Sequence, residues 1–182
     1  MDATLDGDTA AFGDLVRKYQ DRLFTTMVHA IGSHAEAEDV VQEAFAQAFI
    51  KLSSFKRESQ FYTWLYRIAF NTWLSRRRRQ RPTFSLEKNR EARGSEPMDT
   101  SDSAESQAIR EEDVQMLYES MQMLAPDHRQ ILVLREIDGR SYEEIADICQ
   151  LPVGTVRSRL HRARKQLLES VKQRHPELFA SQ

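Results

Sequence analysis

The segment from Ser141 to Lys165, SYEEIADICQLPVGTVRSRLHRARK, constrains the fold of this chain more than any other. Ser141, followed three residues later by Glu144, forms a capping-box pattern that starts a helix. Leu151-Pro152 ends that helix, because proline lacks an N–H and its ring clashes with the preceding turn. Pro152 also fits the start of a second helix, where the missing N–H costs little. The spacing predicts a short helix, a tight turn and a second helix.

The second helix is expected to have an apolar stripe and a basic side. The stripe consists of Val156, Leu160, Ala163 and Leu167. From Leu151 to Arg174 the sequence has seven lysines and arginines and one acid, Glu169. A helix that is merely solvated more often mixes both signs of charge, because i,i+4 ion pairs stabilise it. This pattern is typical of a helix that enters the DNA major groove, with a solvated surface helix as the alternative.

Composition and charge limit the other possibilities. A chain of 182 residues with 40% hydrophobic residues allows one domain or two small ones. The net charge of −2 hides a segregation, since residues 1–50 carry nine acids against three bases while two later segments are basic. Such asymmetry indicates that some surfaces contact a polyanion and another contacts a different partner. With no signal peptide and no apolar run of membrane-spanning length, we expect a cytoplasmic protein without membrane insertion.

Catalysis and metal binding are not expected. The five histidines are scattered, without a ligand spacing such as HExxH, and no carboxylate or histidine cluster suits acid–base chemistry. The one cysteine, Cys149, falls at an apolar helix position and excludes an intramolecular disulfide. We therefore expect no enzyme activity, no metal site, no cofactor and no small-molecule substrate.

Everything that the sequence predicts to be structured is helical. In the first part, Thr9 caps one helix, Gly32-Ser33 separates it from the next, and a third resumes at Thr63 and runs into four arginines, 76–79. In the second part, one helix precedes a stop at Ala125-Pro126, and Asp127 caps another that ends at Asp138-Gly139. The helix–turn–helix pair follows, so the fold class is all-α.

A linker separates these two parts. The segment from Gly94 to Ser106 has four acids, no base and no large aliphatic residue except Met98. Because it cannot bury enough apolar area to fold, we expect a flexible tether. The sequence thus predicts two small helical domains, 1–82 and 108–176, joined by a flexible linker, 83–107.

Aromatic and cationic side chains alternate between Phe55 and Arg81. This combination is typical of surfaces for single-stranded or melted nucleic acid, where stacking contributes roughly 1–3 kcal/mol per base. The alternative is that the rings fill the core. We expect Phe61, Leu65 and Ile68 in the core, and Phe55 exposed at the mouth of a polar loop.

The long second helix has a polar face opposite its apolar stripe. This face consists of Asp39, Gln42, Glu43, Ala46 and Gln47. Such faces are usually only solvated. On a chain that binds polyanions elsewhere, we predict that it meets a basic protein partner.

Three segments in order carry a family resemblance: AEDVVQEAFAQAF (Ala37–Phe49), SFKRESQFYTWLYRIAFNT (Ser54–Thr72) and LREIDGRSYEEIADICQLPVGTVRSRLHRAR (Leu134–Arg164). The chain resembles a bacterial sigma factor of the extracytoplasmic-function (ECF) group, within the sigma-70 family. The first two segments are similar to region 2 and the third to region 4. The resemblance implies that 1–82 binds core RNA polymerase and recognises and melts the −10 element, and that 108–176 recognises the −35 element.

The resemblance also implies three sets of contact residues. Those that dock on the clamp helices of the polymerase β′ subunit are Asp39, Gln42 and Glu43. Those at the −10 element, where Phe55 begins the loop that captures a flipped base, are Phe55, Lys56, Arg57, Phe61, Trp64, Asn71, Trp73, Arg76 and Arg77. Those at the −35 element, with Arg135 on a phosphate, are Arg135, Thr155, Arg157, Ser158, His161, Arg162 and Lys165.

The implied partners are core RNA polymerase, through the β′ clamp helices and the β flap, promoter DNA, and an anti-sigma factor. His161 stands where the family often has an aromatic residue, which leaves the base contact at this position open. A dimeric helix–turn–helix repressor and a nuclease are the alternatives from other classes. The aromatic-basic cluster argues against the repressor, and the absence of a catalytic cluster argues against the nuclease. Co-purification with core polymerase is expected for a sigma factor and not for the repressor.

Overall fold

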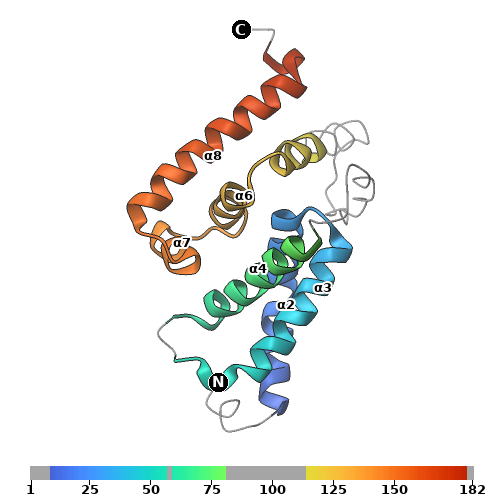
Figure 1. Ribbon diagram of the computed structural model, residues 1–182, viewed down its shortest axis with the longest axis vertical. Coiled ribbons are helices and arrows are strands. Elements are labelled where there is room, and N and C mark those ends of the chain that lie inside the picture. Colours follow the sequence, from blue (N-terminus) through green and yellow to red (C-terminus); the bar gives the residue numbers. More distant parts are fainter. Residues whose placement is uncertain (1–8, 57–58, 81–113, 180–182) are drawn as a thin grey trace, which may run out of the picture.

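The computed structural model describes residues 9–56, 59–80 and 114–179, and every regular element in them is helical (Figure 1). The all-α prediction is therefore confirmed. Besides a helical segment at 114–122, the elements are α2 (Thr9–Ile31), α3 (His34–Ile50), η1 (Leu52–Ser54), α4 (Phe61–Gln80), α6 (Pro126–Leu132), η2 (Val133–Ile137), α7 (Tyr142–Cys149), α8 (Val153–Arg174) and η3 (Pro176–Phe179). The predicted linker, 83–107, and Arg57 lie outside the described residues.

Local capping residues set several helix ends where the sequence predicts them. Ser33 caps α3 and accepts a hydrogen bond from the Glu36 N–H at 3.3 Å. Ser141 and Glu144 form a complete capping box at the start of α7, with N···O distances of 2.9 and 3.1 Å. After α7, Gln150 adopts a left-handed φ of 55°, and the chain turns into α8. The helix–turn–helix pair is thus confirmed.

Other helix ends differ from the prediction. α4 begins at Phe61, two residues before Thr63. Ala125 occupies the N-cap of α6 with Pro126 in the first turn, so Asp127 lies inside the helix and the predicted aspartate cap is wrong. Proline at this position supplies a fixed helical φ and needs no side-chain cap. Pro152 is the N-cap of α8 rather than its first residue.

α6 continues into a π-helical segment, η2, before the helix–turn–helix pair. Gly139 follows with a φ of 69°, which a glycine adopts without the steric cost of a side chain, as the predicted stop requires. Among the described helices, none is long and apolar enough to span a membrane.

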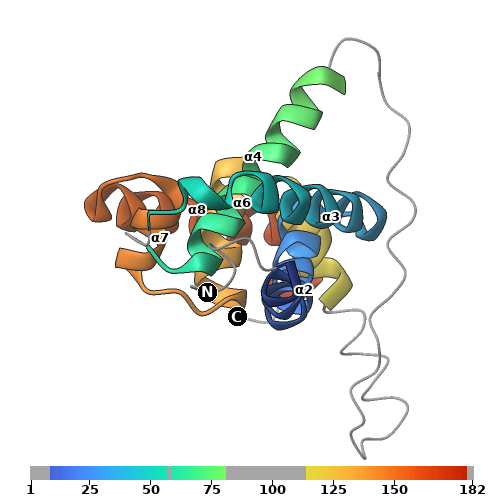
Figure 2. The same ribbon diagram turned by 90° about the horizontal axis from the view of Figure 1, so that it is seen from below.

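The N-terminal helices, α2 to α4, and the C-terminal helices, from residue 114 onward, share one apolar core. Fully buried members come from both groups and include Leu23, Val40, Leu65, Leu134, Ile145 and Leu160. α4 packs against α7, and α2 packs against α6 and η2 (Figure 2). Burial of each large apolar side chain contributes about 1.5–3 kcal/mol. The sequence predicts an apolar stripe from Ala37 to Leu52, and its members are buried except Phe49, which is exposed.

Arg129 joins the two helix groups at the end of α2. Its buried guanidinium donates to the carbonyl oxygens of Ala30 and Ile31, both at 3.2 Å, and to the side chain of Gln122. A cation at this position compensates the unpaired carbonyls of a helix C-terminus. Gly32 has a φ of 94°, a backbone conformation that residues with a side chain rarely adopt, and it lies beside the Gln122 amide. The turn after α2 therefore favours glycine at this position.

Candidate nucleic-acid and polymerase interfaces

α8 runs along the outer edge of the molecule (Figure 1), and its arginines fall into two classes. In the first class, each arginine pairs with an acid on a preceding helical segment. The pairs are Arg159–Asp127 at 3.5 Å, Arg164–Glu136 at 2.6 Å and Arg174–Glu119 at 2.7 Å. The hydrogen bond from Arg164 to Glu136 also raises the pKa of Arg164. These arginines hold α8 against the scaffold helices.

The second class forms the recognition face, which we define as Arg157, Ser158, His161 and Arg162. All four side chains are exposed. Within the described part of the chain neither Arg157 nor Arg162 forms an ion pair, although the Arg157 guanidinium lies 5.8 Å from the Tyr142 ring. Free guanidinium groups on an exposed helix face can donate two parallel hydrogen bonds to a guanine edge. The structure thus brings together four of the residues expected at a −35 element.

The other residues predicted to contact the −35 element lie outside the recognition face. Thr155 is half-buried, and its carbonyl accepts a hydrogen bond from Ser158 at 3.0 Å. Lys165 is exposed, with Glu169 at 3.9 Å. The guanidinium of Arg135 donates to the Arg140 carbonyl at 2.8 Å. Arg135 is therefore already engaged in supporting the turn before α7, which the sequence did not predict.

Cys149 packs where α7 meets the core. It is half-buried, and burial raises the pKa of its thiol to about 12. A thiol with such a pKa stays protonated and unreactive, as expected for a small hydrophobic residue.

Three aromatic side chains pack together near the start of α4. The Phe55 ring centre lies 5.8 Å from that of Phe61 and 5.1 Å from that of Trp64. Phe55 is only 6% exposed, so the prediction that it is exposed is wrong. The short helix η1 turns this residue inward, and the Phe55 N–H donates to the Leu52 carbonyl at 3.0 Å. The sequence suggested an open loop because Ser53 and Ser54 interrupt the apolar pattern, although both belong to the short helix η1.

A cavity of about 230 Å³ lies beside this aromatic cluster. Its lining consists of Ser54, Phe55, Lys56, Ser59, Trp64, Arg67, Asp147 and Gln150. Trp64 is half-buried and Lys56 is exposed, so the cavity has an aromatic wall and a cationic rim. This combination suits an unstacked base next to its phosphate.

Two α4 residues of the predicted −10 set are buried and unavailable to bases. Trp73 is 3% exposed and packs on Phe70, with ring centres 5.3 Å apart. Phe61 is 4% exposed and belongs to the core, as expected from its position. The assignment of both residues to the −10 contact surface is therefore wrong. Asn71 is exposed, and the Arg77 guanidinium covers the Trp73 ring at 5.6 Å.

Arg76 pairs with the polar face of α3 and is not free for DNA. Its guanidinium lies 2.6 Å from the Glu43 carboxylate and 3.4 Å from that of Asp39. Asp39 and Gln42 are exposed as predicted, while Glu43 is half-buried. Glu43 also accepts a hydrogen bond from Gln47 at 3.0 Å. This pairing fixes the side chains of the polar face, although no local sequence signal connects residues that lie 33 apart.

Sequence reasoning also missed the residues that join the two helix groups. Arg67 lies in the aromatic-basic cluster, but its partner Asp147 is 80 residues away. Asp138, a predicted helix-end residue, is a buried acceptor for Arg22. In the described residues, no group of three His, Cys, Asp or Glu side chains is placed to hold a metal ion.

Two family models match this chain. Residues 15–83 match sigma-70 region 2, and residues 114–167 match sigma-70 region 4. The first match includes the aromatic cluster and the polar face, and the second includes the recognition face. The family assignment and the three candidate sites therefore rest on the same segments.

Relatives of the chain include named RNA polymerase sigma factors. The RNA polymerase sigma-H factor of Pseudomonas aeruginosa is 42% identical over 87% of this chain and 85% of that protein. The ECF RNA polymerase sigma-E factor of Escherichia coli is 41% identical, with the same coverage of 87% and 85%.

Two solved structures resemble the whole fold. The sigma factor RpoE in complex with the anti-sigma factor NepR from Bartonella quintana has a TM-score of 0.69 at 27% identity, over 89% of this chain and 97% of that one. CnrH in complex with the cytosolic domain of CnrY has a TM-score of 0.67 at 25% identity, over 93% of both chains. The chain therefore belongs to the ECF group of the sigma-70 family, the non-catalytic factors with which RNA polymerase recognises promoters.

Proposed function

We propose that this sigma factor reads the −35 element with the recognition face of α8, and captures a base of the −10 element beside Phe55 and Trp64. The observation that carries the proposal is the division of the α8 arginines. Arg159 and Arg164 have carboxylate partners, whereas Arg157 and Arg162 are exposed and have no carboxylate partner in the described chain. Unpaired guanidinium groups contact DNA without first losing an ion pair.

Capture of a −10 base contributes to DNA melting in this proposal. An extruded base costs a few kcal/mol to unstack, and stacking on an aromatic ring with phosphate contacts compensates that cost. Trp64 presents a partly exposed ring to the cavity, while Phe55 supports it from below. Lys56 and Asn71 are exposed for contacts with the same strand.

The polar face of α3 is the proposed docking site for the β′ clamp helices. Asp39 and Gln42 are the exposed members, and Arg76 holds the carboxylates in place. RpoE and CnrH, which share this fold, are each bound by a protein regulator, NepR and CnrY. By analogy, we propose that an anti-sigma factor also binds this chain.

The experiment compares Arg162→Ala with Arg164→Ala in holoenzymes made with core polymerase. Arg162→Ala is expected to weaken binding by about 1–3 kcal/mol at its base pair and to relax the preference there. Arg164→Ala removes an arginine of the same helix that pairs with Glu136, and it should leave base preference unchanged. Affinities for a panel of single-base −35 variants measure both effects. Uniform weakening of all variants by Arg162→Ala would contradict base reading.

A further inference from the structure

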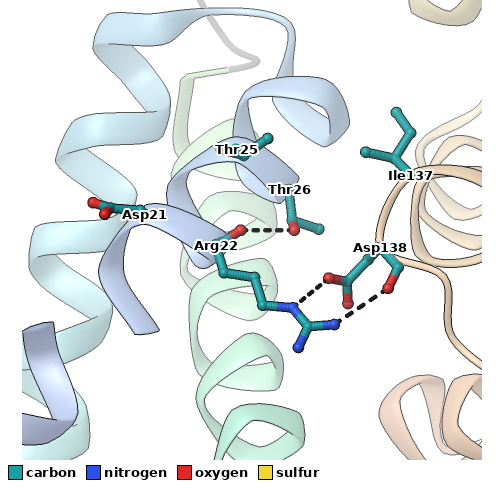
Figure 3. A pocket seen from close by; sticks show the side chains of 6 residues that line it. All are labelled: Asp21, Arg22, Thr25, Thr26, Ile137 and Asp138. Carbon is teal, nitrogen blue, oxygen red and sulfur yellow. Dashed lines mark hydrogen bonds and ion pairs between the residues drawn. The ribbon is translucent and has the colours of Figure 1, made fainter. Parts of the chain in front are cut away.

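Two ion pairs connect the N-terminal helices to the C-terminal helices. Arg22 of α2 pairs with Asp138 after η2, and Arg67 of α4 pairs with Asp147 of α7. Figure 3 shows the first pair, with the Arg22 guanidinium reaching the side chain and the backbone carbonyl of Asp138 at 2.7 and 3.2 Å. We refer to these two contacts as the interdomain ion pairs.

The pair at Asp138 is part of a buried cluster. The Asp138 side chain is 2% exposed and also accepts a hydrogen bond from Arg140 at 2.7 Å. The guanidinium carbons of Arg22 and Arg140 lie 4.6 and 4.7 Å from the centre of the Tyr62 ring. Burial raises the pKa of Tyr62 to about 12, so the ring stays neutral between these two cations. The cluster fixes α2 and α4 against the turn that precedes α7.

The pair at Asp147 lies at the cavity proposed for the −10 base. Arg67 donates to the carboxylate oxygen and to the backbone carbonyl of Asp147, both at 2.5 Å. Asp147 and Gln150 are the only residues of the C-terminal helices in the described lining, and Gln150 donates to the Asp147 carbonyl at 2.8 Å. The end of α7 and the turn that follows it therefore form part of the cavity wall.

A carboxylate and a DNA phosphate bind an arginine in the same way. Each offers anionic oxygens to the donors of the guanidinium group, and each forms charge-assisted hydrogen bonds of similar length. Asp147 therefore occupies the place on Arg67 that a phosphate of the −10 strand would take. Its negative charge also repels a strand that approaches the cavity.

The packing of the two helix groups is incompatible with reading both promoter elements at once. The −10 and −35 elements are named by their positions and are centred about 25 base pairs apart. At 3.4 Å per base pair this is roughly 85 Å along a duplex. In this structure α4 and α7 are in direct contact. The recognition face and the −10 cavity must therefore separate before both can bind a promoter.

From these contacts we propose that Asp147 is an internal mimic of a DNA phosphate: in the free protein it occupies Arg67 at the wall of the −10 cavity, and it yields Arg67 to the −10 strand when the helix groups separate. This inference rests on the proposed function, because it assigns the cavity to −10 DNA. It adds Arg67 as a phosphate-binding residue and Asp147 as the residue that competes for it. The Asp138 pair supports the same closed arrangement.

The first test measures the distance between the helix groups in the free full-length protein. Spin labels are attached to cysteines introduced at the exposed positions Ser75 and Gln173 in a Cys149→Ala background. Asp147→Arg places two arginines together and is expected to shift the distances to longer and broader values. Adding Arg67→Glu restores the opposite charges and should restore the native distances. The control is Asp127→Asn, which removes an acid that pairs only within the C-terminal helices.

Salt gives an independent change in the same measurement. At 1 M ionic strength the screening length falls to about 3 Å, which weakens the repulsion between Arg67 and the introduced arginine, so the distances in Asp147→Arg should move back toward the native values. Asp147→Arg distances that match those of the native protein and of Asp127→Asn would overturn the proposal. The same holds if the charge-swapped pair remains as open as Asp147→Arg alone.

The second test measures binding of a fluorescein-labelled single-stranded DNA dodecamer of mixed sequence to the free protein. Asp147→Asn should increase affinity about tenfold, the equivalent of about 1.4 kcal/mol, because Arg67 becomes available. Asp127→Asn should change affinity less than about twofold. In an Arg67→Gln background the gain from Asp147→Asn should disappear. An unchanged affinity, or an equal gain without Arg67, contradicts the competition.

Transcription separates this inference from the proposed function. If the variants show native distances and affinities while the native protein still directs promoter-specific transcription by core polymerase, the internal mimic is wrong and the proposed function stands. If the native protein directs no promoter-specific transcription, the proposed function is wrong whatever the distances show.

Discussion

The arginines of α8 have different roles in this protein. The sequence predicts which side of the helix each arginine occupies, but it does not predict which acid each one pairs with. Periodicity placed the α8 arginines opposite the buried stripe, and Val156, Leu160 and Ala163 are indeed buried. Which arginines are paired depends on acids that lie 32, 28 and 55 residues away. No local sequence pattern shows which arginines are paired. The structure is therefore needed to distinguish the recognition face from the arginines that hold α8 in place.

The aromatic residues show the same limit. A polar neighbourhood suggested that Phe55 is exposed, but burial depends on how η1 turns the chain toward α4. Trp73 was assigned to DNA through its motif, although its indole is buried against Phe70. Within an aromatic-basic segment, composition indicates a nucleic-acid surface without identifying which rings form it.

Substitution of Phe55 tests its structural role directly. Phe55→Ala should lower the free energy of unfolding by about 3–5 kcal/mol, because it leaves a cavity beneath Trp64 and Phe61. Phe49→Ala is the matched control, since Phe49 is 47% exposed and its loss should cost about 1 kcal/mol or less. Urea unfolding followed by circular dichroism measures both values. Equal losses for the two variants would mean that Phe55 is not part of the core.

At the level of elements, the helix–turn–helix pair was the most predictable part of the chain. Its start, turn and apolar stripe are all encoded within 25 consecutive residues, from the capping box of Ser141 to Lys165. The π-helical segment η2, which packs against α2 and α7, was not predicted, and the N-cap of α6 is Ala125 rather than the predicted Asp127. Local chemistry therefore predicts where helices exist, and tertiary contacts adjust their ends.

The capping box gives a quantitative test at this scale. Ser141→Ala removes the acceptor for the Glu144 N–H and should reduce stability by about 1 kcal/mol. The hydrogen bond from the Ser141 N–H also lowers the pKa of Glu144, so this carboxylate remains charged near neutral pH. Ser75→Ala, at an exposed position inside α4, should be neutral or slightly stabilising because alanine favours helices. A loss at Ser141 no larger than at Ser75, measured by urea unfolding, would contradict the role of the cap.

For the whole molecule, the sequence predicted two helical parts but not the contact between them. The shared core and the interdomain ion pairs join residues such as Arg22 and Asp138, which are 116 positions apart. Neither periodicity nor charge runs reveal such pairs. The family resemblance predicted the role of each part, while the structure shows that the two parts meet at the cavity beside Phe55 and Trp64.

The most direct test of the central claim is transcription from genomic DNA by core RNA polymerase with and without this protein, with the 5′ ends of the transcripts sequenced. We predict discrete start sites only when the protein is present, preceded by two shared elements at −10 and −35. Arg157→Ala combined with Arg162→Ala should remove these starts, while Arg164→Ala should retain them. Identical 5′ ends with and without the protein would contradict the assignment of this chain as a promoter-recognising sigma factor.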